Sequence, residues 1–278
     1  MKRLSVALLG SVLCVASLPE AALAGGSALA PHRAVYDMEL DQAEGQSGIA
    51  SLSGRMVYDF SGNSCDGYSV SFRFVTEFQD ESGGSQVTDL QTTSFEAPDA
   101  KAYEFLSKTF VNQKLTESTR GKAKQSDDVK LVDLAEPEKR SVLITDTALF
   151  PTEHLKRVIS SALDGTRFVA ADVYDGSETG DKVFSTTAVI GAVRDDAETI
   201  TGAAGQVEKL DGVKRWPVTI AYFDPSQEEG GEQTPVYQLT FVLYENGVSR
   251  ELILDYGDFA MKGKLTDLKF YDSESCPN

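Results

Sequence analysis

Histidines and cysteines, the side chains that most often carry chemistry, are few in this 278-residue chain. It has two histidines, His32 and His154, and three cysteines, of which only Cys65 and Cys276 lie outside the apolar N-terminal stretch. Two histidines so far apart match no metal-ligand pattern such as H-E-x-x-H. The G-x-S-x-G motif that exposes the nucleophilic serine of many hydrolases is also absent from the sequence. The sequence therefore predicts no metal, no cofactor and no catalytic residue.

The two histidines have different sequence settings. His154 falls in the first turn of a segment with helical periodicity, where we expect a solvated side chain. His32 is isolated near the N-terminus, which favours a hydrogen-bonding or surface role over metal ligation.

Four carboxylates, Asp172, Asp175, Glu178 and Asp181, gather in one short stretch. The stretch lacks the spacing and the twelfth-position Glu of a calcium-binding EF-hand loop. Its Asp-Gly and Gly-Asp pairs are typical of a turn between two strands. A glycosidase would need two carboxylates at a set separation in space, which no sequence provides. We therefore expect a turn here.

Cys65 and Cys276 are the two cysteines that remain after removal of the expected signal peptide. An even number of cysteines in an oxidising compartment predicts one disulfide bond. A redox-active pair is the alternative. It is disfavoured because the two cysteines form no C-x-x-C motif and because neither is flanked by Lys, Arg or His to lower a thiol pKa. The expected disulfide is structural and ties the C-terminus to an early strand.

The N-terminus has the layout of a secretory signal peptide. Lys2 and Arg3 precede an uncharged apolar stretch from Leu4 to Leu18, and Ala22-Leu23-Ala24 supplies a small-x-small cleavage pattern. A bilayer-spanning helix needs about 20 apolar residues, and this stretch ends earlier, at Pro19. The sequence predicts a cleaved signal peptide at residues 1–24, a bacterial periplasmic location and no transmembrane anchor.

Cys14 raises the alternative of a lipoprotein. Lipid attachment usually requires a small residue before the cysteine, and Leu13 occupies that place. We therefore expect release from the membrane and not lipidation.

The charge of the chain excludes one class of partner. Removal of Lys2, Arg3 and Glu20 with the signal peptide leaves 24 basic and 42 acidic residues, a net charge of −18. Nucleic-acid binding normally requires a basic surface that releases counterions, and anionic membranes attract basic segments. We expect no nucleic-acid partner.

Most of the remaining chain alternates apolar and polar residues between turn signals, the pattern of an antiparallel sheet. We expect strands at residues 35–40, 48–60, 68–74, 86–96, 102–111, 114–122, 129–134, 167–174, 182–190, 214–223, 237–244, 249–256 and 261–271. The residues at 227–232 are polar and Gly-rich and predict an exposed loop.

In one segment the apolar residues recur at helical spacing and not in alternation. Five apolar residues fall at helical spacing and form one stripe: Leu155, Val158, Ile159, Ala162 and Leu163. Thr152 is the expected N-terminal cap, and Gly165 the C-terminal end. A helix of about 11 residues is unstable alone, so its apolar face must lie against a sheet or in a groove.

No shift in amino-acid composition along residues 25–278 marks a domain boundary. Large β architectures often contain 200 to 250 residues in one unit. We therefore expect a single β-rich domain.

Several stretches, in order along the chain, resemble the family of the periplasmic cell-envelope integrity protein EipB. They are residues 30–36, 53–58, 65–68, 150–154, 173–177, 245–250 and 254–259. The resemblance implies a long antiparallel sheet wound into a spiral or open barrel with one helix near its concave side, similar in outline to lipoprotein carriers. It also implies a role in envelope homeostasis and stress resistance, and a disulfide between Cys65 and Cys276.

The function expected from these features is that of a noncatalytic periplasmic factor. It would maintain the envelope by binding a periplasmic protein or a lipid-like or lipoprotein partner. The alternative is a hydrolase of envelope components. An apolar groove would favour binding, and converging carboxylates or a nucleophile in a polar cleft would favour hydrolysis.

Overall fold

The computed structural model describes residues 29–45, 47–194, 200, 202–227, 233–272 and 276. The expected signal peptide lies outside the described residues, as does most of the expected loop at 227–232.

The described chain consists of β-strands, one α-helix and two short 3-10 helices. The strands are β1 (His32–Ala43), β2 (Ile49–Asn63), β3 (Gly67–Asp80), β4 (Ser85–Glu96), β5 (Ala102–Val111), β6 (Lys114–Ser126), β7 (Val129–Glu136), β8 (Arg140–Thr145), β9 (Phe168–Val173), β10 (Phe184–Ile190), β11 (Ala204–Gly205), β12 (Arg215–Phe223), β13 (Tyr237–Tyr244), β14 (Ser249–Asp255) and β15 (Phe259–Phe270). The helices are α1 (Pro151–Leu163), η1 (Val207–Leu210) and η2 (Pro225–Gln227). In this part of the chain no helix is long and apolar enough to cross a bilayer.

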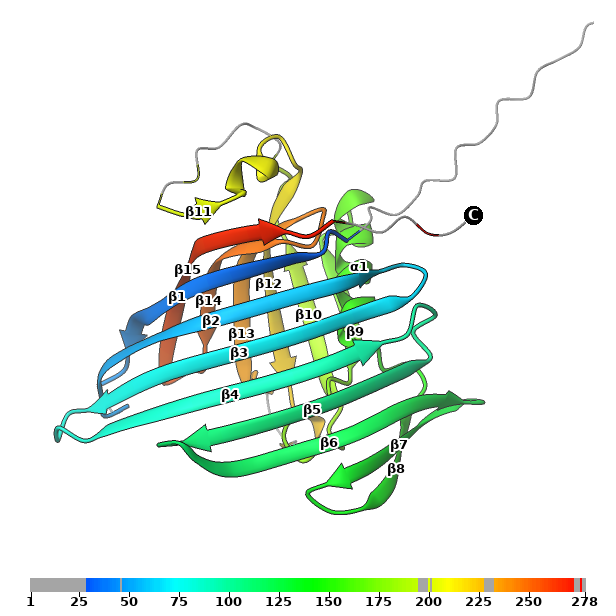
Figure 1. Ribbon diagram of the computed structural model, residues 1–278, viewed down its shortest axis with the longest axis horizontal. Helices are drawn as coiled ribbons and strands as arrows, with labels where there is room; N and C mark the ends of the chain where they lie inside the picture. The colour runs from blue at the N-terminus through cyan, green and yellow to red at the C-terminus, as the bar shows by residue number, and fades with distance from the viewer. Residues whose placement is uncertain are drawn as a thin grey trace, which may run out of the picture.

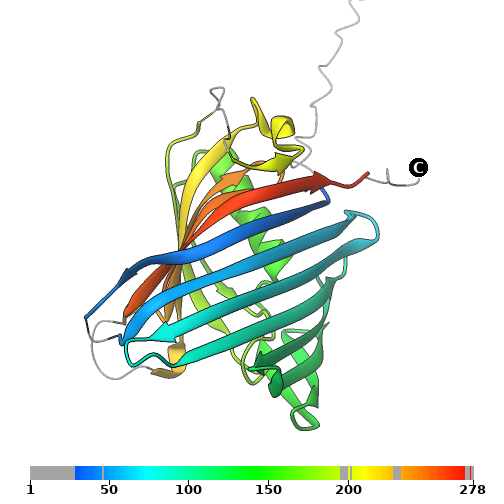
Figure 2. The same cartoon turned by 60° about the vertical axis from the view of Figure 1, so that its left-hand side comes forward.

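The strands form one sheet in the order β8-β7-β6-β5-β4-β3-β2-β1-β15-β14-β13-β12-β10-β9, with β11 added beside β15. All neighbours along this path are antiparallel. The sheet is not closed, because its two ends, β8 and β9, do not pair. It coils so that β1–β6 lie in front of β9, β10 and β12–β14 (Figures 1 and 2). The predicted long antiparallel sheet with one helix is confirmed.

The first and last long strands pair at the middle of the sheet. β1 and β15 are antiparallel from His32 opposite Phe270 to Ala43 opposite Phe259. This pairing joins the sheet formed by β1–β8 to the sheet formed by β9–β15.

The sequence analysis did not predict strand β8. β8 follows Pro137 and pairs with β7, but only Ile144 of its six residues is fully buried. A short strand at a sheet end shows little alternation, and for that reason the sequence pattern does not mark it.

The inner face of the coiled sheet holds two apolar cores. The main core joins inward-facing residues of β1–β3, β10 and β12–β15 to helix α1. The second core lies between β5–β8 and the chain on either side of α1 and β9, where Tyr103, Phe105, Phe150 and Tyr174 pack their rings together. Burial of this apolar surface is the main driving force for the coiling.

Helix α1 confirms the predicted helix and most of its apolar face. Val158, Ile159 and Ala162 are buried in the main core and Leu155 packs against it. Leu163 was assigned to the buried stripe wrongly, since 40% of its surface is exposed. It is the last residue of the helix.

The expected cap at Thr152 is also wrong. The helix begins after Phe150, with Pro151 in its first turn, and Thr152 lies inside the helix. Proline suits this position because the first helical N–H groups have no intrahelical partner. Gly165 ends the helix as expected, with φ +77° and its N–H donated to the carbonyl of Ala162 at 3.2 Å.

The predicted turn between β9 and β10 contacts the opposite half of the coiled sheet. Tyr103 donates its hydroxyl proton to the carbonyl of Asp175 at 3.1 Å, and Thr119 donates to the carbonyl of Glu178 at 2.6 Å. Gly176 has φ +71°, and a Cβ there would meet the ring of Phe105. The segment therefore packs directly on the inner face of β5 and β6.

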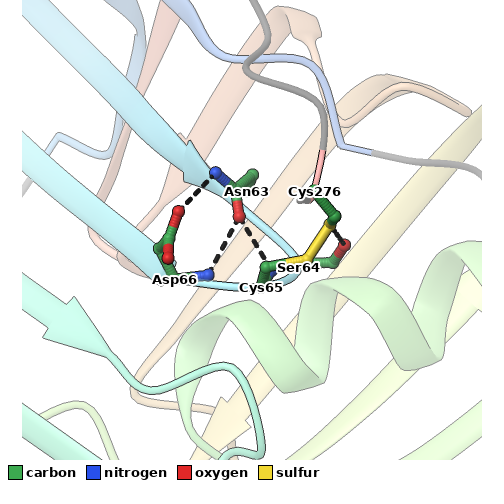
Figure 3. Close-up of a disulfide and its surroundings, with 5 residues drawn as sticks. All are labelled: Asn63, Ser64, Cys65, Asp66 and Cys276. Atoms are coloured by element: carbon green, nitrogen blue, oxygen red, sulfur yellow. Dashed lines mark hydrogen bonds between the residues drawn. A yellow bond between two sulfur atoms is a disulfide. The ribbon is translucent and has the colours of Figure 1, made fainter. Parts of the chain in front are cut away.

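Cys65 and Cys276 form a disulfide bond in the structure, with 5.8 Å between their Cα atoms (Figure 3). Cys65 lies in the turn between β2 and β3. The side-chain oxygen of Asn63 orders this turn by accepting the N–H groups of Cys65 at 2.8 Å and Asp66 at 2.9 Å. The bond ties the chain after β15 to the turn that follows β2.

Reduction of this disulfide is expected to lower the free energy of unfolding. The cysteines are 211 residues apart. Closing a loop of that size reduces the conformational entropy of the unfolded chain and so stabilises the fold by at most about 5 kcal/mol. Urea unfolding with and without reductant measures the change. The double variant Cys65→Ser/Cys276→Ser is the control and should not respond to reductant. An unchanged midpoint in the unsubstituted protein would contradict the prediction.

Candidate functional site: an apolar cavity inside the coiled sheet

A cavity of about 380 Å³ lies between helix α1 and the inner faces of the two halves of the sheet. Its walls are mostly aliphatic and aromatic side chains, an environment suited to an apolar ligand. The lining residues are His32, Tyr36, Met56, Tyr58, Val70, Phe72, Pro151, Thr152, His154, Leu155, Val158, Ile220, Tyr222, Leu239, Phe241, Leu243, Gly247, Ser249, Leu252 and Leu254.

Strand register explains why these side chains converge. Tyr58 on β2 lies opposite Phe72 on β3, and Leu239 on β13 lies opposite Leu254 on β14. Alternate residues of a strand share one face, so each strand contributes every second side chain to the cavity wall. Leu155 and Val158 of α1 cover the space from the helix side.

Two polar groups in the cavity wall have backbone partners. The Nδ1 atom of His32 donates to the carbonyl of Ala30 at 2.7 Å, and the Tyr36 hydroxyl donates to the carbonyl of Ser249 at 2.6 Å. Burial lowers the pKa of His32, against the opposing effects of the Ala30 hydrogen bond and the charge of Asp59. His32 therefore has the hydrogen-bonding role expected from its sequence.

His154 is buried, which contradicts the expected solvated side chain. It is 5% exposed, and its Nε2 lies 3.4 Å from the Thr186 hydroxyl on β10. Burial, helped by the charge of Arg157, lowers its pKa to about 4. The side chain points toward the sheet because His154 shares a helix face with Val158.

Glu96 fixes the helix that covers the cavity. It is the last residue of β4, between Tyr68 and Tyr103 on neighbouring strands, and is 4% exposed. Its two carboxylate oxygens accept the N–H groups of Thr152 at 2.8 Å and Glu153 at 2.9 Å. A carboxylate at a helix N-terminus satisfies N–H groups that have no partner within the helix.

The pKa of Glu96 is raised by burial, although the hydrogen bonds from the helix N-terminus act in the opposite direction. Sequence reasoning missed this residue because its partners are 56 and 57 positions away. The one indication is that Glu96 is a charged residue on the sheet face that also carries its buried cross-strand neighbours Tyr68 and Tyr103.

A larger hollow of about 1180 Å³ lies over β2–β8. Register assigns Ser69, Phe95 and Glu104 to the face opposite the buried Tyr68 and Tyr103. Several of its charged side chains form ion pairs, as Lys122 does with Glu104 at 2.8 Å. This hollow is more open to solvent than the apolar cavity and is lined by both charged and apolar side chains, so it is less suited to enclosing an apolar ligand.

The other residues that the sequence analysis singled out do not line the cavity. The disulfide lies outside the cavity lining, and the carboxylates of the β9–β10 region have mostly local partners: Asp172 accepts Ser185, Glu178 pairs with Lys182, and Asp181 pairs with Arg140. Among the described residues, no three His, Cys, Asp or Glu side chains lie close enough to hold a metal ion.

An open, coiled antiparallel sheet around an apolar cavity defines the class of protein as barrel-like and β-rich. Comparison with known proteins identifies the family: residues 23–272 match the model of the EipB-like family, and the chain belongs to it. It is 43% identical over 256 residues to the cell envelope integrity protein EipB of Brucella abortus strain 2308, covering 91% of this chain and 88% of that protein.

A solved structure has the same architecture. The crystal structure of a beta-barrel-like protein of a domain of unknown function from Brucella abortus superposes with a TM-score of 0.82 at 42% identity. The match covers 88% of this chain and 99% of that one. The predicted resemblance to the EipB family is confirmed.

Replacing Glu96 by Ala is expected to lower the free energy of unfolding by about 2 to 6 kcal/mol. The substitution leaves two N–H groups without their carboxylate partner, and each unsatisfied buried group costs about 1 to 3 kcal/mol. Glu96→Gln retains one acceptor oxygen and should lose less. Glu104→Ala, an exposed carboxylate on the next strand, is the matched control and should cost under about 1 kcal/mol. Equal losses for Glu96→Ala and Glu104→Ala in urea unfolding would refute the capping role.

His154 is expected to make the fold sensitive to mild acid. Its pKa in the folded chain, about 4, lies below the ordinary value of 6.5, so the folded state favours the neutral ring. The stabilisation is complete above pH 6.5 and falls as the pH drops toward 4, by about 2 kcal/mol at pH 5. Urea unfolding at pH 7.5 and pH 5 should show a smaller difference for His154→Gln than for the unsubstituted protein. The same difference in both proteins would rule out this origin.

Proposed function

We propose that the chain is an exported, noncatalytic factor of the bacterial cell envelope that binds the apolar part of a lipid-like partner in its internal cavity. The observation that carries the proposal is the 380 Å³ cavity with its predominantly aliphatic and aromatic wall. Its volume lies within the range of small-molecule sites, about 300 to 1,000 Å³.

The family supports the cellular setting. The curated relative is named a cell envelope integrity protein, which supports a role in envelope integrity here. The signal-peptide pattern at residues 1–24 supports export to the periplasm as a single unit of residues 25–278.

The polar groups of the cavity support binding over hydrolysis. Its lining residues include neither a carboxylate nor a cysteine. The two histidines have partners in the Ala30 carbonyl and the Thr186 hydroxyl. Ser249 is the one serine of the lining, so Ser249→Ala tests the hydrolytic alternative directly.

Filling the cavity should weaken binding while the fold remains. Leu239→Trp adds bulk on the inner face, and Ile253→Trp, on the outer face of neighbouring β14, is the matched control. We expect dodecyl maltoside, titrated calorimetrically below its critical micelle concentration, to bind the mature protein and the control alike and Leu239→Trp at least about tenfold more weakly. Thermal unfolding checks that both variants fold.

The same variants can be tested in a deletion strain under envelope stress. Ser249→Ala should rescue growth and Leu239→Trp should not. Failure of dodecyl maltoside to bind the mature protein would overturn the proposed lipid-like ligand. Loss of rescue in a folded Ser249→Ala protein would favour chemistry over binding.

A further inference from the structure

Two neighbouring residues of the cavity wall, His32 on β1 and Tyr58 on β2, each keep one polar atom that no described residue hydrogen-bonds. His32 pairs with Phe60, and Tyr58 lies two residues before Phe60 on the same strand. Residues two apart on a strand share one face, so His32 and Tyr58 are diagonal neighbours on the inner face of the sheet. Their ring centroids are 5.8 Å apart.

The hydrogen bond of His32 fixes which of its ring nitrogens carries the proton. A carbonyl oxygen can only accept, so Nδ1 donates its proton to the carbonyl of Ala30, 2.7 Å away. Burial lowers the pKa of His32, so the ring is neutral at pH 7, and a neutral imidazole has a single N–H. Nε2 is therefore an acceptor, and no described residue donates to it. Because the side chain is only 2% exposed, a ligand in the cavity is the donor available to it.

The hydroxyl of Tyr58 is a donor without an acceptor among the described residues. Burial, helped by the charge of Glu96, raises the pKa of this hydroxyl, so it stays protonated and able to donate. Tyrosine hydroxyls in apolar surroundings usually have a hydrogen-bond partner. Tyr36, in the same cavity wall, follows that rule, since its hydroxyl donates to the carbonyl of Ser249 at 2.6 Å. The Tyr58 hydroxyl is thus left for a ligand.

The polar groups of the cavity suit an uncharged ligand group. The described lining residues include no Asp, Glu, Lys or Arg. His154, the second histidine of the lining, is also neutral at pH 7, because burial, helped by the charge of Arg157, lowers its pKa to about 4. An ion in such a cavity would lose its hydration without gaining a counter-charge. A hydroxyl group fits the two free atoms, because it donates one hydrogen bond and accepts another.

We propose that His32 and Tyr58 bind the hydroxyl group of an uncharged amphiphile whose apolar chain occupies the rest of the cavity. The ligand hydroxyl donates to Nε2 of His32 and accepts from the hydroxyl of Tyr58. The side chains that β13 and β14 contribute to the lining, such as Leu239, Phe241 and Leu254, suit the alkyl chain. The inference rests on the proposed function and adds the chemistry of the ligand's polar end.

Three probes of similar length test the proposal: octan-1-ol, its isomer heptyl methyl ether, and octanoate, each present as monomers in solution. The ether contains the same atoms as the alcohol but has no proton to donate to His32, and octanoate is charged. Calorimetric titration of the mature protein at pH 7 is expected to show octan-1-ol binding at least about tenfold more tightly than the other two. A site that hydrogen-bonds a hydroxyl discriminates against analogues that leave its polar groups unpaired.

Single substitutions assign the two hydrogen bonds. His32→Phe removes the acceptor and should bind the alcohol and the ether with equal affinity. Tyr58→Phe removes the donor and should weaken octan-1-ol binding at least about threefold, the loss of one neutral hydrogen bond. Tyr68→Phe is the matched control, because Tyr68 stacks on Phe60 but is not among the lining residues. It should bind octan-1-ol as the unsubstituted protein does, and thermal unfolding checks that all three variants fold.

Equal affinity of the unsubstituted protein for octan-1-ol and heptyl methyl ether would overturn the hydroxyl site and leave the proposed lipid-like ligand intact. This comparison requires no variant and stands even if a substitution prevents folding. Octanoate binding as tightly as octan-1-ol, or equal effects of Tyr58→Phe and Tyr68→Phe in folded proteins, would also overturn it. If octan-1-ol does not bind, the hydroxyl site is refuted, and the titration with dodecyl maltoside decides separately on the proposed function.

Discussion

The fold depends on the antiparallel pairing of β1 with β15. Every other link between long neighbouring strands of the path connects strands close in sequence, whereas this one joins the two ends of the domain, from His32 opposite Phe270 onward. Without it, β1–β8 and β9–β15 would be two separate sheets, each with an uncovered apolar face. With it, the inner faces form one continuous surface that must coil to exclude water. The disulfide of Cys65 with Cys276 restrains the chain just beyond this pairing and supports it by limiting the unfolded state.

Coiling leaves an opening between the unpaired ends of the sheet, and helix α1 and the β9–β10 turn occupy it. The helix packs Val158 and Ile159 into the main core, and Glu96 holds its N-terminus from β4. The turn packs Gly176 on Phe105 of β5. Each element thus connects one half of the sheet to the other through side chains and backbone groups, without extending the strand ladder.

The cavity follows from the same geometry. One helix has too small an apolar face to fill the whole interior, and space remains beside Leu155 under β12–β14. Two of the polar side chains that reach this space, His32 and Tyr36, are held by backbone carbonyls. The interior therefore presents a predominantly apolar wall, which suits the apolar part of a ligand.

The sequence by itself predicted most of the strands and the helix, because alternation and helical spacing report which side of each element is apolar. It also predicted the disulfide, because only two cysteines lie outside the apolar N-terminal stretch. It also carried the resemblance to the EipB family. The tertiary structure alone decided what covers each apolar face. It buried His154, exposed Leu163 and brought Glu96 to a helix 56 residues away. Local periodicity cannot encode such contacts, because they depend on how the sheet coils, and the coil is set by pairing between strands at opposite ends of the chain.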